Sequence, residues 1–283
     1  MVSTIKKETY ALVTGGSSGI GLAFVHQLAE RGYNICIVSN QKEELTVLEN
    51  EIAAKHKVKC VSFFIDLAHD DAAQKVHGFC KDRNLNIEVL INNAGFLIVD
   101  EFINVAPERI TALLKLHTLT PTLLCQLIAK DMAAHKKGFI LNVSSTSAYM
   151  PYPLISLYGS SKSYIRNFTR AMRNELYSKN IHVSCILPGA VDTNLYDLSD
   201  AKKKVAKRLG IMHSREFIAK RGLDILFKNK GELVPGIFNK LSLILPKLIP
   251  DFAIRKLLHS WNRSKLNTKT PGTTSKSSVP DPT

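Results

Sequence analysis

The sequence lacks the long apolar run that a membrane-spanning helix needs. Its 283 residues contain no stretch of about 18 uninterrupted apolar residues. The most lipophilic segment, residues 241–250, is short and contains Lys247 and two prolines. The first eight residues also lack the apolar core of a secretory signal. We therefore expect neither a spanning helix nor secretion.

Cysteine is scarce, and no two cysteines stand in a Cys-x-x-Cys pair. The five are scattered through apolar or helical stretches: Cys36, Cys60, Cys80, Cys125 and Cys185. This pattern excludes a disulfide framework and a zinc site of the usual spacing. We expect buried free thiols, no bound metal and a reducing, cytoplasmic location.

Acidic residues are rare in one part of the chain. Residues 201–270 contain 17 Lys and Arg against four Asp and Glu, and this segment accounts for most of the net charge of +14. A nucleic acid, an anionic membrane, an acidic substrate or plain solvation could each accompany such a surface. The remaining composition, 45% hydrophobic and 22% charged, excludes a disordered or collagen-like chain.

Short apolar runs alternate with helical patterns along the chain. Strands are predicted at residues 10–14, 34–38, 58–65, 87–91, 139–143, 181–187 and 233–236. The first helix is predicted to begin after Gly21 and to run through Arg31. Further helices are predicted at residues 42–56, 70–83, 107–136, 157–179, 202–210 and 214–229. This alternation predicts an α/β fold, a doubly wound parallel Rossmann-type sheet with helices on both faces. We expect one domain over residues 1–236, a basic extension over 237–266 and a disordered tail over 267–283.

A glycine-rich turn lies between the first strand and the first helix. It reads Thr14-Gly15-x-x-x-Gly19-x-Gly21, which differs in spacing from the G-x-G-x-x-G form. Glycines let the backbone approach a pyrophosphate, and a helix N-terminus favours the anion. The pattern favours dinucleotide binding, and a ligand-free turn is the alternative.

Two further groups follow the third and fourth strands. Asp66 could accept a hydrogen bond from an adenine amino group, or it could cap a helix that begins at Leu67. The run Asn92-Asn93-Ala94-Gly95 could tie neighbouring strand ends together and leave room for a cofactor, or it could form a simple turn.

Tyr158 and Lys162 are the chemically suggestive pair. At positions i and i+4 of a helix they share one face, and an ammonium beside a phenol lowers the pKa of the phenol. A phenol tuned in this way can exchange a proton with a carbonyl or alcohol oxygen. Ser145, at the end of the fifth strand, could bond the same oxygen.

Together these motifs resemble the short-chain dehydrogenase/reductase family over about residues 8–195. The resemblance implies a seven-stranded sheet and a nicotinamide cofactor, with Tyr158 as general acid/base, Lys162 on the ribose and Ser145 orienting the carbonyl. It implies that the following residues bind the cofactor: Gly15, Ser17, Ser18, Gly19, Ile20, Gly21, Ser39, Asn40, Lys42, Asp66, Leu67, Asn93, Ala94, Gly95, Tyr158, Lys162, Pro188, Gly189, Val191 and Thr193.

One position departs from the family pattern. The family usually has a catalytic asparagine in the long helix before the fifth strand, and the matching residue here is His117. Histidine can donate or accept a proton, so a proton relay through it is one interpretation. A packed histidine without a role is the other.

The end of the second strand carries the information on cofactor choice. The run Val38-Ser39-Asn40-Gln41-Lys42 has no acidic residue to hold a ribose 2′-hydroxyl and none to repel a 2′-phosphate. The arginine common in NADP-preferring relatives is also missing, and Lys42 and Ser39 could replace it. We expect NADP(H), with NAD(H) as the alternative.

We therefore predict an enzyme that interconverts a carbonyl and a secondary alcohol. An apolar lid at about residues 194–229 indicates a lipophilic substrate, such as an acyl chain or a steroid. Its apolar members are Leu195, Tyr196, Leu198, Ile211, Met212 and Phe217. A cofactor-binding sensor or scaffold without chemistry is the rival hypothesis. The resemblance also implies a homodimer or homotetramer formed through the helices at 107–136 and 157–179.

The C-terminal extension has a pattern of its own. Ile254, Leu257, Leu258 and Trp261 form one face of a predicted helix whose other face is basic. Such a helix could make peripheral contact with an anionic membrane, or its apolar stripe could pack on the protein. No nucleic-acid recognition motif accompanies the charge, so we expect no nucleic-acid partner.

Overall fold

The computed structural model describes residues 8–149, 152–192 and 212–243. The chain divides into two compact units, 1–243 and 244–283, and all described residues belong to the first. The expected helix at 202–210, the first half of the expected lid and the amphipathic segment beyond residue 243 lie outside the described residues.

Seven parallel strands form the central sheet. They are β1 (Tyr10–Thr14), β2 (Asn34–Ser39), β3 (Cys60–Phe64), β4 (Ile87–Asn92), β5 (Gly138–Val143), β6 (Ile181–Ile186) and β9 (Glu232–Leu233). Their order across the sheet is β3-β2-β1-β4-β5-β6-β9, and every neighbouring pair is parallel. The order reverses between β1 and β4, which is where doubly wound sheets bind ligands. The predicted fold class is confirmed.

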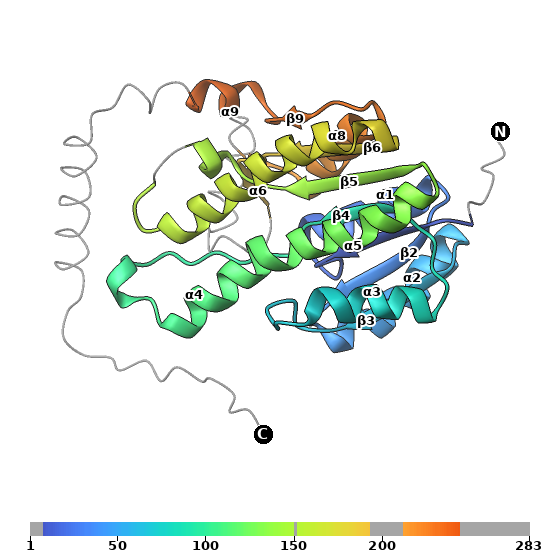
Figure 1. Ribbon diagram of the computed structural model, residues 1–283. Helices are drawn as coiled ribbons and strands as arrows, with labels where there is room; N and C mark the ends of the chain where they lie inside the picture. The colour runs from blue at the N-terminus through green and yellow to red at the C-terminus, as the bar shows by residue number, and fades with distance from the viewer. Residues whose placement is uncertain (1–7, 150–151, 193–211, 244–283) are drawn as a thin grey trace. The chain divides into compact units, whose positions relative to one another are not determined.

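Helices cover both faces of this sheet (Figure 1). On one face lie α1 (Gly19–Glu30), α2 (Lys42–His56) and α8 (Arg215–Phe227). On the other lie α3 (Ala72–Asp82), α5 (Thr120–Ala134) and α6 (Ser156–Glu175). Strand side chains alternate between the two cores, as Leu12 and Val13 of β1 illustrate. The central strands are mostly apolar because both of their faces are covered.

Shorter elements complete the described part of the chain. They are α4 (Pro107–Leu114), α9 (Ile237–Ser242), the 3₁₀ turns η1 (Phe102–Asn104), η3 (Thr146–Tyr149) and η4 (Tyr177–Lys179), the π-helical turn η2 (Lys115–Leu119) and the two-stranded pair β7 (Ala190–Val191) and β8 (Met212–His213). Local chemistry marks some of the helix starts. Pro107 occupies the first turn of α4, and the Ser214 hydroxyl accepts the Phe217 N–H at 3.1 Å to cap α8.

The long helix expected at 107–136 is confirmed over Pro107–Ala134, and it contains a π turn that the sequence did not predict. α4 and α5 are joined by η2, in which the Thr120 N–H bonds the Lys115 carbonyl five residues back. A π turn holds one residue more than an α turn, and hydropathy periodicity does not reveal the extra residue. The stretch Pro107–Ala134 is long and apolar enough to cross a membrane by length and composition alone, and residues of α5 pack in the core against the sheet.

The cysteine prediction is confirmed for four of the five thiols. All five cysteines are free, and Cys36, Cys80, Cys125 and Cys185 are buried whereas Cys60 is partly buried. Burial raises the pKa of the Cys125 thiol to about 12, so this thiol stays protonated and unreactive.

The buried side chain of Glu88 connects β4 to the residue that precedes β2. The Tyr33 hydroxyl, just before β2, donates to Glu88 Oε1 of β4 at 2.8 Å, and Lys137 Nζ lies 3.2 Å from Glu88 Oε2. Tyr33 is 1% exposed and Glu88 is 7% exposed, so the carboxylate depends on these partners rather than on water.

Tyr33→Phe is expected to lower the free energy of unfolding by about 1.5–3 kcal/mol, because it removes a hydrogen bond to a buried charge without changing packing volume. Urea denaturation measures the change. Tyr177→Phe serves as the control, since Tyr177 is 74% exposed and should unfold like the wild type. Equal stability of the Tyr33 variant and the wild type would contradict this account of Glu88.

Candidate active site

A cavity of about 740 Å³ opens along the carboxyl ends of the central strands. The predicted residues that line it are Ser17, Ser18, Gly19, Ile20, Asn93, Gly95, Ser145, Tyr158, Lys162, Pro188, Gly189 and Val191. It lies at the reversal of strand order between β1 and β4. The topology therefore brings residues from six separate parts of the chain to one place.

The glycine turn forms one wall of this cavity. Gly15 and Gly19 have φ values of +62° and +55°, a region that side chains disfavour. A Cβ on Gly21 would lie 2.0 Å from the Gly15 carbonyl oxygen, so only glycine fits there. Ser18, in extended conformation, is the N-cap of α1, and the first residues of that helix, Gly19 and Ile20, line the cavity. Such a turn is suited to an anionic group.

The asparagines at the end of β4, Asn92 and Asn93, tie strand ends together, as the sequence suggested. The Asn93 side-chain amide donates to the carbonyl oxygens of Thr14 at 3.0 Å and Gly15 at 3.2 Å. The Asn92 amide donates to Asn142 Oδ1 of β5 at 2.8 Å. These bonds hold the ends of β1, β4 and β5 in register around the cavity.

Asp66 makes a local turn instead of capping a helix. Its Oδ1 accepts the Ala68 N–H at 2.9 Å, and α3 begins only at Ala72 with Asp71 as N-cap. The alternative of a helix from Leu67 is therefore wrong, because the Asp66 side chain bonds the backbone two residues later and forms a local turn there.

Lys162 anchors α6 to the end of β5. Its ammonium donates to the Val143 carbonyl at 3.0 Å, and its own carbonyl accepts the Ser144 hydroxyl at 2.7 Å. The Lys162 nitrogen lies 5.6 Å from the ring centre of Tyr158. Burial lowers the pKa of Lys162 to about 8, which leaves it largely protonated at neutral pH. Tyr158 and Lys162 thus share one face of α6, as their spacing predicted.

Ser145 lies in the turn that follows β5. Its oxygen accepts the Ser147 N–H at 3.2 Å, which leaves the hydroxyl proton available to a group in the cavity. The Thr146 N–H bonds the Pro188 carbonyl at 3.0 Å, which attaches this turn to the segment that follows β6. Ser145 therefore faces the same space as Tyr158.

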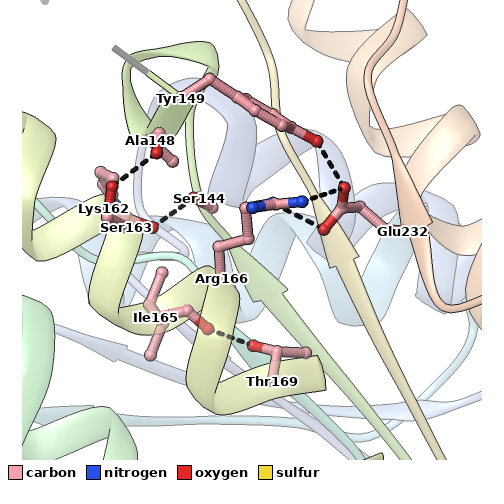
Figure 2. Close-up of polar contacts among 9 residues, drawn as sticks. All are labelled: Ser144, Ala148, Tyr149, Lys162, Ser163, Ile165, Arg166, Thr169 and Glu232. Atoms are coloured by element: carbon pink, nitrogen blue, oxygen red, sulfur yellow. Dashed lines mark hydrogen bonds and ion pairs between the residues drawn. The ribbon is translucent and has the colours of Figure 1, made fainter. Parts of the chain in front are cut away.

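A charged cluster fixes the turn η3 against α6 and the last strand (Figure 2). Arg166 donates two hydrogen bonds to the carboxylate of Glu232, at 2.8 and 3.0 Å, and the Tyr149 hydroxyl donates to the same carboxylate. The Arg166 guanidinium also lies 4.1 Å from the Tyr149 ring centre. Paired, two-pronged contacts of this kind give geometric specificity. Sequence reasoning missed this cluster, since 66 residues separate Arg166 from Glu232.

His117 does not line the cavity. It lies behind Tyr158, with the two ring centres 5.6 Å apart and nearly perpendicular. Together with Lys162 and Asn92, His117 lines a second cavity of about 20 Å³. Asn92 Oδ1 is buried there with no hydrogen-bond partner in the described part of the chain. A cavity of this size has room for one water molecule.

Several other predicted cofactor residues do not line this cavity. They are Gly15, Gly21, Ser39, Asn40, Lys42, Asp66, Leu67 and Ala94. Ser39 is buried, and its oxygen lies 2.7 Å from the Ser17 oxygen. Thr193 lies outside the described residues.

The structure also adds residues that sequence reasoning missed. Gln41 Oε1 accepts the Ser17 hydroxyl, which connects the end of β2 to the glycine turn. Eight further residues line the cavity: Leu22, Phe96, Val143, Ser144, Asp192, Ser214, Arg215 and Glu216. Arg215 and Glu216 reach it because α8 packs beside α1, a contact between distant segments that no local pattern signals.

Comparisons with known proteins agree with this geometry. A family model described as short chain dehydrogenase matches residues 9–204. Hydroxysteroid dehydrogenase-like protein 1 of Gallus gallus is 30% identical over 247 residues, which are 86% of this chain and 72% of that protein.

Two other relatives match over a shorter part of their length. Very-long-chain 3-oxoacyl-CoA reductase of Bos taurus is 33% identical over 191 residues, which are 66% of this chain and 60% of that protein. 17-beta-hydroxysteroid dehydrogenase type 3 of Homo sapiens is 34% identical over 189 residues, 65% of this chain and 59% of that protein.

Among solved structures, a short-chain dehydrogenase from Sphingobium yanoikuyae in complex with NADPH superposes with a TM-score of 0.72 at 22% identity, covering 95% of this chain and 99% of that chain. This likeness concerns the fold. The family model, the relatives and the convergence of the glycine turn with Tyr158 and Lys162 lead to one conclusion: the chain belongs to the short-chain dehydrogenase/reductase family, the oxidoreductases that act on alcohol and carbonyl groups with NAD(P).

Proposed function

We propose that the protein is an NADP(H)-dependent oxidoreductase that interconverts a carbonyl and a secondary alcohol on a lipophilic substrate. The observation that carries this proposal is the convergence of Ser145, Tyr158 and Lys162 on a cavity whose other wall is the glycine turn. The rival hypothesis, a sensor or scaffold without chemistry, is not favoured, because all three groups are present and the relatives named above are a reductase and dehydrogenases.

The residues of the cavity fit a dinucleotide. No side chain fills the cradle at Gly15 and Gly21, and the first amides of α1 are suited to a pyrophosphate. Lys162 would hold the nicotinamide ribose, and Pro188 and Gly189 would border the ring. A bound nicotinamide supplies or accepts the hydride.

The chain's own residues then manage the substrate oxygen. In the reductive direction Tyr158 donates its phenolic proton to the carbonyl oxygen, and Ser145 donates a second hydrogen bond that holds this oxygen. The nearby ammonium of Lys162 stabilises the phenolate that remains. The small cavity lined by Lys162 and Asn92 has room for a water molecule beside the lysine.

Tyr158→Phe is expected to retain NADPH binding and to lower kcat by about 10²–10⁴-fold, because the ring remains while the acidic proton is lost. NADPH fluorescence titration and steady-state turnover measure the two properties. Tyr177→Phe is the matched control and should turn over like the wild type. Unchanged turnover of the Tyr158 variant would remove it from the chemistry.

The choice of NADP(H) is supported by the end of β2. Asn40, Gln41 and Lys42 follow β2 as exposed residues, and none of them carries a negative charge. The Lys42 nitrogen lies 6.0 Å from the ring centre of Phe64, at the end of the neighbouring strand β3. A cation held at these strand ends attracts a 2′-phosphate.

Lys42→Glu is expected to raise the Kd of NADPH by about tenfold and to leave the Kd of NADH within about twofold, since only NADPH carries the 2′-phosphate. Fluorescence titration with each cofactor measures both constants. Lys59→Glu is the matched control. Lys59 precedes β3 and so lies at the amino ends of the strands, whereas Lys42 follows the carboxyl end of β2. Tighter binding of NADH than of NADPH by the wild type would reverse the proposed preference.

The proposal of a lipophilic substrate rests on the relatives and on the sequence of the lid. Leu195, Tyr196, Leu198 and Ile211 lie outside the described residues. Met212 is buried and Phe217 is 39% exposed at the start of α8. One relative is named for very-long-chain acyl substrates and another for a hydroxysteroid.

In a series of 2-alkanones, kcat/KM is expected to rise roughly fourfold per added methylene until the chain fills the cavity, because each buried methylene contributes about 0.8 kcal/mol. Initial rates of NADPH consumption measure the series, and a steroidal ketone tests the alternative lipophilic class. A small polyhydroxylated ketone is the control. Faster turnover of this polar ketone would contradict a lipophilic substrate.

Assembly and location are also proposals. We infer a homodimer or homotetramer formed through α5 and α6, supported by the exposed apolar side chains of Leu119, just before α5, and Tyr164 on α6. A cytoplasmic location is supported by the five free thiols. Peripheral membrane contact through the basic segment at 251–263, or packing of that segment on the protein, rests on the sequence alone.

A further inference from the structure

His117 occupies the middle of the π turn η2 and is enclosed by the protein. Its side chain is only 3% exposed. The His117 ring packs edge-on against the ring of Tyr158, and the centre of the Phe96 ring lies 5.9 Å from the centre of the His117 ring. A Cβ on Gly95 would approach the His117 Nε2 atom to 2.7 Å, so the close approach of this segment depends on glycine. The ring is therefore held on several sides.

Two hydrogen bonds define the protonation of this ring. The Phe96 backbone N–H can only donate, and it lies 3.1 Å from His117 Nε2, so Nε2 accepts and carries no proton. The proton of the neutral ring is then on Nδ1, which donates to the Ser161 oxygen at 2.9 Å. The structure thus selects one neutral tautomer.

The second of these bonds continues to the catalytic helix. The Ser161 hydroxyl donates to the carbonyl oxygen of Tyr158 at 2.8 Å. A continuous line of hydrogen bonds therefore runs from Phe96, beside the cavity, through His117 and Ser161 to the backbone of Tyr158. It joins the segment after β4, the π turn η2 and α6.

The same bonds leave His117 no means to carry a proton. Protonation of Nε2 would break the bond to Phe96 and place a charge in a closed site. The ionisable side chains that face the ring, Lys162 and Tyr158, both lie on α6, and the charge of Lys162 opposes a second positive charge on His117. Burial, followed by the charge of Lys162, holds the pKa of His117 well below its ordinary value. His117 accordingly stays neutral over the working range of the enzyme.

We propose that His117 is a positioning residue and takes no part in proton transfer. Its neutral ring holds Tyr158 in position through the hydrogen bond to Ser161 and through contact between the two rings. This inference rests on the proposed role of Tyr158. It differs from both interpretations that the sequence offered, a relay and a packed side chain without a role.

Three substitutions of His117 and one of Ser161 separate the two bonds. In His117→Asn the amide nitrogen takes the place of Nδ1 and keeps the bond to Ser161, whereas in His117→Gln the amide oxygen takes the place of Nε2 and keeps the bond to Phe96. His117→Phe keeps the ring and loses both bonds. Ser161→Ala breaks the line from its other side and leaves His117 intact.

His117→Phe is expected to lower kcat by about 10- to 100-fold, because small displacements of a catalytic group have effects of this size. His117→Asn and His117→Gln should fall between the wild type and His117→Phe. KM and the Kd of NADPH should stay within about twofold, since the cavity walls are unchanged. The pH profile of kcat should keep its shape and midpoint in every active variant, because His117 does not titrate.

A double-mutant cycle tests the link to Ser161 directly. Ser161→Ala should lower kcat in the wild type by about as much as His117→Gln does, and it should add little to His117→Gln, which has already lost that bond. NADPH titration and thermal unfolding of each variant establish that it is folded. If His117→Phe proves unfolded, the cycle with Ser161→Ala still tests the line.

Three results would overturn the inference. The first is full turnover by His117→Phe, and the second is the loss of an ionisation from its pH profile, which would identify a relay. The third is additive loss in the cycle with Ser161. A wild type that turns over no carbonyl compound with NADPH would overturn the proposed function and this inference together, whereas the three results above leave the proposed function standing.

Discussion

The attachment of Lys162 to the end of β5 is the interaction on which the arrangement of the site depends. A buried ammonium is costly to desolvate, and its bond to the Val143 carbonyl at 3.0 Å offsets part of that cost. Ser144 returns a bond to the Lys162 backbone at 2.7 Å, so strand and helix hold each other at two points. Tyr158 lies one helical turn before this anchor. Its distance from the lysine is therefore set by helix geometry, and its distance from Ser145 by the strand end.

Three further polar contacts hold α6 along its length. Near its start, Ser161 connects it to the π turn through His117. At its middle, Arg166 connects it to β9 through Glu232, which also holds the turn after Ser145. Farther on, Thr169 accepts the Asn142 amide of β5 at 2.8 Å. Each contact is buried or nearly so and is matched with a partner, which is how buried polar groups give a helix one position instead of several. The catalytic groups therefore sit on a rigid element.

The opposite wall of the cavity follows a different logic, because there the backbone itself is the binding surface. The glycine turn leaves no side chain between the amides of α1 and a ligand, and the Asn93 side chain holds the turn by its carbonyl oxygens. Stiffness comes from the asparagine and access comes from the glycines. A polar anchor one residue after β4 thus shapes a site that belongs mostly to β1 and α1.

The sequence by itself determined the α/β class, five of the seven central strands to within one residue at each end, and the pairing of Tyr158 with Lys162. These properties depend on local periods: two residues in a strand, and three to four in a helix. Only the tertiary structure decided that η2 holds one extra residue, that Asp66 closes a turn, and that Arg166 meets Glu232. The π turn depends on the packing of His117 against α6. No hydropathy pattern within residues 107–136 indicates this contact. Contacts between residues tens of positions apart arise when the sheet brings its strand ends together, so their partners are set by the fold.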